Sequence, residues 1–328
     1  MSRYIAKRLV YLVFVFFLLS VIVFAIYQFV PGDRAAMMVD ESLRTRNPVL
    51  YQKMYQQARL DLGLDKPVYV QYFSWIGKML QGDFGFSSQY RQPVKNIVSA
   101  PLWNTVQLNI LNLILVFAIT IPLGITTAVR KNSTYDNVVQ VGTVIGMSIP
   151  SFVLALIFIC FFAVMIPIFP ISGMVTAGAS FNGFFDEFID RVYHMLLPVI
   201  VLTVSSLAGI TRYIRSAMSD ELTKDYIRTA RAKGLTEKVV IYSHAFRNSM
   251  IIVVSIFAGW FLGIFGGSIA IEQMFLFNGI GLVTIQGLRT QDFSIVMAMN
   301  MFYIVISLVG NLLTDICYTL VDPRVKLT

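Results

Sequence analysis

Long uncharged stretches alternate with short charged ones along this chain of 328 residues. The hydrocarbon core of a bilayer is roughly 30 Å thick, and a helix needs about 20 apolar residues to cross it. Each long uncharged run therefore predicts one membrane-spanning helix. The expected spans are 9–30, 105–129, 138–166, 192–211, 250–271 and 294–321. The pattern thus predicts an all-α membrane protein with six transmembrane helices.

Residues 31–101 interrupt this pattern because they mix charges with turn-forming residues. Two segments within this region nevertheless have helical spacing, one over 51–62 and one that Pro67 is placed to open. We therefore expect 31–101 to be a compact helical insertion. The predicted domains are a tail with the first span (1–30), this insertion (31–101), a transmembrane domain (102–321) and a C-terminal tail (322–328).

The distribution of Lys and Arg sets the expected orientation in the membrane. These residues gather before the first span, at 130–131 and over 212–247, whereas the short segments on the other side hold only Arg191 and Arg289. By the positive-inside rule, both termini are then cytoplasmic and 31–101 lies outside. Because 56% of the residues are hydrophobic and 13% charged, the net charge of +8 indicates cytoplasmic loops rather than a nucleic-acid-binding face.

The largest cytoplasmic segment contains the most ordered charged stretch of the chain. Asp225–Lys233 has the pattern of a short helix, and Gly234 stands where the residue after the last turn belongs. Thr236 is placed to cap a second helix, with Leu235 and Val240 as its hydrophobic staple. From the residues alone, this loop is either a docking surface for another protein or a solvated basic loop.

The segment 228–234, which reads RTARAKG, resembles the EAA loop of ATP-binding-cassette (ABC) importer permeases. Arg228 and Thr229 stand where the general motif has Glu and Ala, a form typical of the first permease of the dipeptide/oligopeptide/nickel family. Further segments fit that family along the whole chain, and Asn278 departs from it by replacing the usual Pro. These segments are VPGD, LGLDKPVYVQY, GDFGFS, SIPSF, HAFRN, IEQMF and LVDPRVKL.

The resemblance implies a type I importer permease of a bacterial or archaeal cell membrane. It implies a second permease subunit, expected to be a different one, two cytoplasmic ATPases and an external solute-binding protein that delivers peptide. It also implies that the loop 216–247 couples to an ATPase. The coupling residues would be Asp225, Tyr226, Arg228, Thr229, Ala230, Arg231, Ala232, Lys233, Gly234 and Leu235.

The sequence contains no G-x-x-x-x-G-K-[ST] phosphate loop, no H-E-x-x-H and no G-x-S-x-G. We therefore expect no cofactor, metal or nucleotide site on this chain and no enzymatic activity of its own. ATP and Mg²⁺ would bind to the ATPase partners.

Polar residues inside the predicted spans are candidates for the translocation pathway or its gate, although hydrogen bonds between helices explain most of them equally well. Glu272, at the outer end of the fifth predicted span, is placed to face an outer mouth. The candidates are Gln107, Asn109, Asn112, Glu272, Asn300, Ser307 and Asn311.

Several alternatives remain open at this point. Within the same family the cargo would be nickel, haem or oligosaccharide instead of peptide, because the external binding protein largely makes that selection. A different class is an ATPase-independent secondary transporter or a channel, which would transport without any partner.

Overall fold

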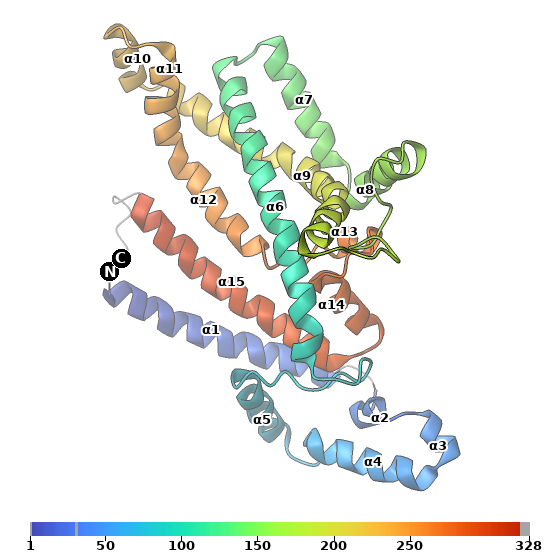
Figure 1. Cartoon of the computed structure of the whole chain (residues 1–328). Helices are drawn as coiled ribbons and strands as arrows, with labels where there is room; N and C mark the ends of the chain where they lie inside the picture. The colour runs from blue at the N-terminus through green and yellow to red at the C-terminus, as the bar shows by residue number, and fades with distance from the viewer. Residues whose placement is uncertain (1, 30–31, 322–328) are drawn as a thin grey trace. The chain divides into compact units, whose positions relative to one another are not determined.

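The computed structural model describes residues 2–29 and 32–321 and is helical throughout, apart from turns and one isolated β-bridge between Phe86 and Pro93 (Figure 1). The predicted tail 322–328 lies outside the described residues. The chain divides into two compact units. Unit 1 comprises residues 1–102 and 283–308, and unit 2 comprises residues 103–282 and 309–328.

Unit 1 contains the first long helix and four shorter ones. Local capping explains where the short helices begin: the Asp33 carboxylate accepts hydrogen bonds from the N–H groups of Ala35 and Ala36, and the Asn47 side chain accepts one from the N–H of Leu50. The helices are α1 (Ser2–Phe29), α2 (Arg34–Met38), α3 (Ser42–Arg46), α4 (Pro48–Asp61) and α5 (Val68–Leu80).

Helix α5 packs against α1 through aromatic side chains. The ring of Phe24 lies 5.5 Å from the rings of both Tyr72 and Trp75, and the hydroxyls of Ser20 and Tyr72 are 2.8 Å apart. Ile76 and Met79 on the same helix form a buried cluster with Met301. The segment 31–101, predicted as a separate insertion, is therefore tied to the first helix within unit 1. Its boundaries as a domain stay a prediction.

In unit 2, α7 (Thr134–Ser148) packs along α9 (Phe184–Leu222) (Figure 1). Three of the remaining helices, α6, α14 and α15, have residues in both units, and the bounds of all of them are as follows. The long helices are α6 (Val94–Val129), α7 (Thr134–Ser148), α9 (Phe184–Leu222), α12 (Arg247–Gly263) and α15 (Phe293–Val321). The shorter elements are α8 (Ser151–Ile159), the π-helical turns η1 (Cys160–Met165) and η2 (Val240–Phe246), α10 (Asp225–Ala232), α11 (Glu237–Val239), α13 (Ile269–Met274) and α14 (Ile280–Arg289).

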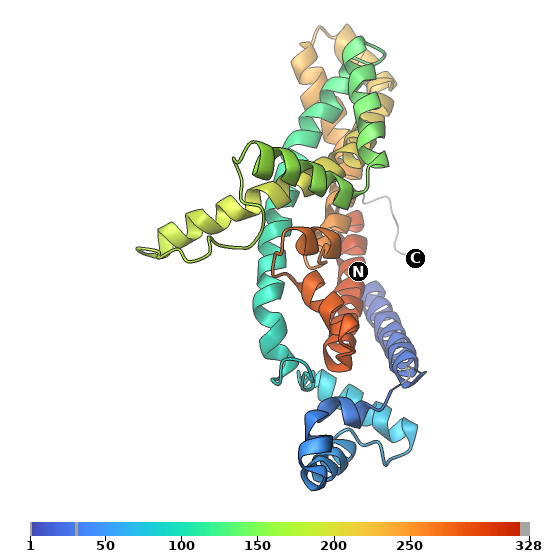
Figure 2. The ribbon, with the colours of Figure 1, turned by 90° about the vertical axis from the view of Figure 1, so that its right-hand side faces the viewer.

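The span predicted over 138–166 is not one continuous helix, because the chain bends by 99° between α7 and the α8–η1 segment (Figure 2). Pro150 has no N–H to donate, and its ring disfavours helical geometry at the preceding residue. Ile149 accordingly has φ −89° and ψ 119°, which is extended. The SIPSF segment is therefore a break in the helix.

The span predicted over 250–271 is likewise not one continuous helix. Helix α12 ends at Gly263, an irregular turn follows, and α13 begins at Ile269. The side-chain amide of Asn109 donates to the carbonyl oxygens of Gly263, Ile264 and Gly266 at 2.9–3.2 Å. A remote side chain thus satisfies the carbonyls that a continuing helix would have used.

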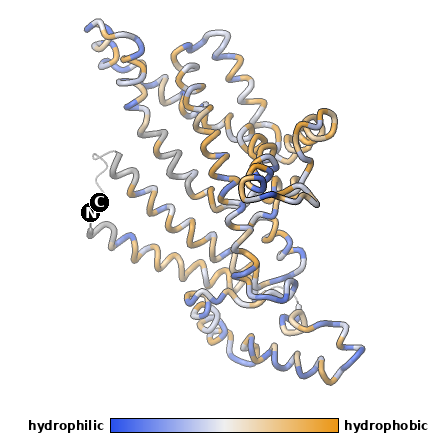
Figure 3. Tube along the Cα trace, viewed as in Figure 1, coloured by the Kyte–Doolittle hydropathy of each residue, from blue (hydrophilic) through white to orange (hydrophobic). Residues whose placement is uncertain are grey.

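Among the described residues, four helices are long and apolar enough to cross a membrane, or five if the bent α7–α8–η1 segment is one span. They are segments of α1, α6, α9 and α15. Figure 3 shows the contrast between the apolar α1 and the hydrophilic α4. The multi-span helical architecture agrees with the prediction, and the number of six spans stays a prediction.

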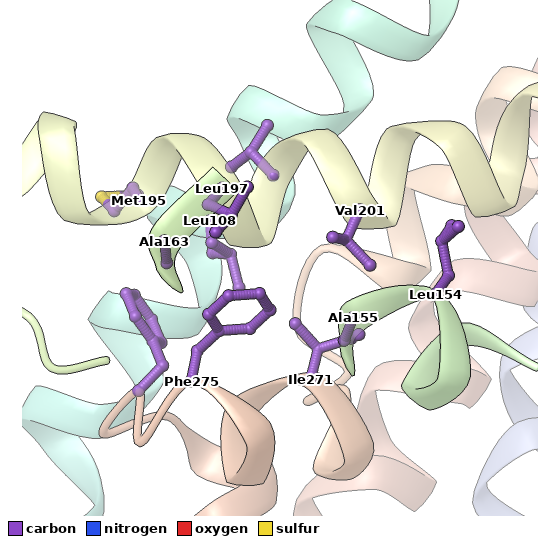
Figure 4. Packing of buried hydrophobic residues seen from close by; sticks show 11 residues of the cluster. Leu108, Leu154, Ala155, Ala163, Met195, Leu197, Val201, Ile271 and Phe275 are labelled. Carbon is purple, nitrogen blue, oxygen red and sulfur yellow. The ribbon is translucent and has the colours of Figure 1, made fainter. Parts of the chain in front are cut away.

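The core of unit 2 forms where α6, α8, α9 and the α13 segment meet (Figure 4). Phe275 points toward Leu108 and Leu197, and Ile271 lies beside Ala155; the four larger side chains are at most 1% exposed. Each buried side chain of this size contributes roughly 1.5–3 kcal/mol of transfer free energy. This core fixes α13 and the turn after it against the first part of α6.

Candidate functional site

The predicted coupling segment folds as a short helix that ends at a glycine. Helix α10 ends with two hydrogen bonds, from the N–H of Gly234 to the carbonyl of Arg231 (2.9 Å) and from the N–H of Leu235 to the carbonyl of Ala230 (3.3 Å). Gly234 has φ +77°. This is the Schellman arrangement, which requires left-handed backbone at the glycine. The predicted glycine corner is therefore present.

Helix α10 has one buried face and one exposed face. Ile227 is fully buried and Ala230 is 6% exposed, whereas the side chain of Arg228 is 77% exposed. Of the two small residues among the predicted coupling residues, Ala232 is exposed and Ala230 is not. Ala230 packs inside the loop, because α10 folds back onto η2.

An ion pair closes the corner between the two halves of the loop. The Arg231 guanidinium donates to the Glu237 carboxylate at 2.8 Å and 3.3 Å. This hydrogen bond and charge lower the pKa of Glu237 below its usual range. Thr236 occupies the predicted cap position, but its side chain makes no capping hydrogen bond. The loop is ordered around a cationic outer face.

The predicted pathway residues fall into different environments. Asn109 and Asn112 line one cavity of about 290 Å³ in unit 2, together with Trp260. Gln107 is half-buried, and Ser307 and Asn311 are exposed on α15. Asn300, in unit 1, donates to the carbonyl of Val296 at 2.9 Å. A gate or pathway role for these residues stays a prediction.

Glu272, predicted to face an outer mouth, is fully buried instead. Its carboxylate accepts hydrogen bonds from the Thr105 hydroxyl (2.9 Å) and from the N–H of Leu282 (2.8 Å). The Thr105 oxygen also accepts from the N–H of Ile280 at 2.8 Å. Glu272 and Thr105 together thus cap the start of α14. Gly279 is needed beside them, because a Cβ there would overlap the carboxylate.

Sequence reasoning missed one ion pair that ties α7 to α9. The Arg215 guanidinium donates two hydrogen bonds to the Asp136 carboxylate, both of 2.6 Å. The Asp136 side chain is 1% exposed. The sequence does explain the position of Asp136 itself, because acidic residues are favourable in the first turn of a helix. Nothing in the sequence indicates its partner, 79 residues away.

Among the residues that the structure describes, no group of three His, Cys, Asp or Glu side chains is placed to hold a metal ion.

Several apolar helices long enough for a bilayer, with an ordered cationic loop between them, have the architecture of a multi-pass membrane protein. The chain matches the family "Binding-protein-dependent transport system inner membrane component" over residues 120–327 and the N-terminal family of the same components over residues 1–94. It belongs to this family of ABC importer permeases. It is a transmembrane permease subunit of an ATP-driven importer, located in the cell membrane.

Relatives of this chain are similar over its full length. It is 37% identical over 327 residues to the oligopeptide transport system permease protein AppB of Bacillus subtilis, covering 99% of this chain and 100% of the relative. It is 35% identical over 328 residues to the dipeptide transport system permease protein DppB of Lactococcus lactis, covering 100% of each. The recognition of a dipeptide/oligopeptide-type permease is confirmed.

A solved structure supports the fold. Inward-facing MetNI, a methionine ABC transporter, matches with a TM-score of 0.51 at 17% identity, over 67% of this chain and 96% of the matched chain. The type I importer permease fold is therefore confirmed. Subunits of this family are permeases rather than ATPases, and they work with ATPase and binding-protein partners.

Proposed function

We propose that this chain is one of two different permease subunits of a peptide importer and forms half of its translocation pathway. The names of its full-length relatives support peptide as the cargo, since they are oligopeptide and dipeptide permeases. An external binding protein would deliver the peptide. Asn109 and Asn112 would lie on the pathway, which their position at a cavity of unit 2 supports.

The loop 216–247 would be the surface that binds a cytoplasmic ATPase. The observation that carries this proposal is the ordered α10, whose exposed face presents Arg228 and Lys233 while Ile227 anchors the helix from within. A loop that only sets the orientation of the chain in the membrane acts through its positive charge and requires no fixed structure. A helix that binds another protein must present a fixed shape. ATP and Mg²⁺ would bind to the ATPases, and this chain would hold no cofactor.

The loop is suited to transmit a movement because it continues a long helix. Helix α9 is unbroken from Phe184 to Leu222, even though it contains Pro198, and α10 begins at Asp225. When ATP closes the two ATPases on each other, the α10 helices of both permease subunits would approach. The attached spans would then shift from an inward-facing to an outward-facing arrangement.

A pair of glycine variants tests the coupling surface. Gly234→Val places a β-branched residue in left-handed backbone, which such residues strongly disfavour. Gly234→Asn is the matched control, since Asn tolerates this conformation. No atom lies within 4 Å of a Cβ at this position, so the two variants differ by backbone strain rather than by a clash.

We expect the purified complex with Gly234→Val to assemble in the membrane but to lose peptide-stimulated ATP hydrolysis, and the Asn variant to keep it. Lys233→Glu should act like the Val variant, by reversing a charge on the docking face. Normal stimulated hydrolysis in both the Val and Glu variants would exclude this loop as the coupling site.

The cargo is tested on the assembled transporter with its binding protein. The bound solute is released from the co-purified binding protein and identified by mass spectrometry. Peptides are the expected result, and nickel, haem or an oligosaccharide would overturn peptide import within the same family. Uptake by this chain alone in proteoliposomes, without ATPases, would indicate a secondary transporter or channel.

A further inference from the structure

The cavity at Asn112 is a small, partly open hollow lined by α6, α12 and the turn after α12 in unit 2. Its volume of about 290 Å³ is at the lower limit of ligand pockets, which hold roughly 300–1,000 Å³. It therefore has room for a short segment of a larger molecule. The polar part of its lining is formed by Asn109 and Asn112, the aromatic part by Trp260, and the part without side chains by Gly259 and Gly263.

Asn112 presents one fixed hydrogen-bond donor to this cavity. The side chain is 7% exposed, and its oxygen accepts a hydrogen bond of 3.1 Å from the buried hydroxyl of Thr203. In this arrangement the amide oxygen of Asn112 faces Thr203, and its NH₂ group lies at the other end of the amide. Within residues 2–29 and 32–321, no hydrogen bond engages the Asn112 Nδ2.

The other walls are rigid and carry no charge. The Trp260 ring is held edge-to-face by Phe117, with ring centroids 6.5 Å apart at 82°. Gly259 and Gly263 lie one helical turn apart, and a Cβ at either position would meet no atom within 4 Å. Asn109 fixes the end of α12 through the carbonyl of Gly263. The cavity thus combines a neutral donor, an aromatic surface and an open strip of backbone.

We propose that this cavity is a subsite for the main chain of the transported peptide, a proposal that rests on peptide import. The Asn112 Nδ2 donates a hydrogen bond to a peptide carbonyl oxygen. The Trp260 ring and the glycine strip accommodate the adjoining Cα and its side chain. Every residue of a peptide offers the same carbonyl acceptor. A neutral donor beside an uncharged wall therefore binds peptides without selecting among their sequences.

The experiment uses the complete transporter, trapped with a non-hydrolysable ATP analogue in the presence of its binding protein. The probe is an equimolar pool of tripeptides, and the retained peptides are quantified by mass spectrometry at a subsaturating concentration. Asn112→Asp keeps the acceptor for Thr203 and the side-chain size but removes the donor. Retention should fall about fivefold, the effect of one neutral hydrogen bond of about 1 kcal/mol, and it should fall for all sequences alike.

A second pair of variants fills the cavity without touching Asn112. Gly259→Leu should reduce retention at least as much as Asn112→Asp. Gly142→Leu, on α7, is the matched control, since Gly142 is also a helical glycine with no atom within 4 Å of a Cβ. It should retain peptides like the wild type.

Unchanged retention in both Asn112→Asp and Gly259→Leu would overturn the subsite, as would a loss confined to particular side chains. A wild-type complex that retains no tripeptide would instead count against peptide import itself. The two failures are therefore distinguishable.

Discussion

The Arg215–Asp136 ion pair joins the first turn of α7 to α9, shortly before the chain enters the coupling loop. The two parallel hydrogen bonds form a bidentate guanidinium–carboxylate contact, the strongest geometry for such a pair. Asp136 is almost completely buried, whereas the Arg215 side chain is 21% exposed. The two partners should therefore respond unequally to substitution.

Arg215→Ala leaves a buried carboxylate that still accepts a hydrogen bond from the N–H of Asn132 at 2.9 Å but has lost its counter-charge. Breaking a buried pair in this way lowers the free energy of unfolding by about 3–5 kcal/mol. Because a hydrogen bond to the carboxylate remains, we expect the lower end of this range, about 3 kcal/mol. Asp136→Asn leaves an arginine that reaches water, so we expect a smaller loss of about 1–2 kcal/mol. Because either change destroys the same contact, the double variant should lose less than the sum.

The free energy of unfolding of the purified complex, measured by SDS titration in mixed micelles, checks these values. Arg212→Ala is the control, because Arg212 lies on the same helix and is exposed. Strictly additive single and double variants would refute the reasoning. So would an Arg215→Ala complex as stable as the Arg212→Ala complex.

Two further predictions concern the hydrogen bonds at Glu272 and Glu237. Thr105→Val should lower the free energy of unfolding by about 2 kcal/mol, since it removes the Thr105 hydrogen bonds to the buried Glu272 carboxylate and from the Ile280 N–H. Thr120→Val, also on α6, should be neutral in the same assay, because the buried Thr120 hydroxyl has no hydrogen-bond partner in the described part of the chain. Glu237 has a lowered pKa, so its pairing with Arg231 is fully present above the ordinary glutamate pKa of about 4.3 and is lost as pH falls through the folded-state pKa. The wild-type pair is therefore intact at every pH from 6 to 8. Peptide-stimulated ATP hydrolysis by Glu237→Gln should be lower than that of the wild type by the same factor throughout this range.

The sequence was sufficient for features that depend on neighbouring residues. The end of α10 at Gly234 follows from the need for left-handed backbone after the last turn, and uncharged runs mark α1, α6 and α15. The bend at Pro150 was also readable, since proline disfavours helix at the preceding residue. Hydropathy alone does not reveal this bend, because the apolar run continues on both sides of Pro150.

Features that depend on distant residues were not predictable in the same way. The interruption after Gly263 is stabilised by Asn109, which is more than 150 positions earlier in the chain. Glu272 looked like a mouth residue because it follows an apolar run, yet Thr105 and the start of α14 enclose it. A single sequence contains the residues of such contacts but not their pairing.

The polar face of α6 shows why the choice between a pathway and hydrogen bonding cannot be made for a whole helix. Thr105, Asn109 and Asn112 are spaced by four and three residues, which places them on one face. Thr105 and Asn109 use their polar atoms to hold the α14 start and the α12 end. Within the described residues, the Asn112 side chain makes one hydrogen bond, through its oxygen to Thr203. Hydrogen bonding within the unit therefore accounts for the first two side chains, whereas the Asn112 nitrogen is the atom that the proposed subsite would use.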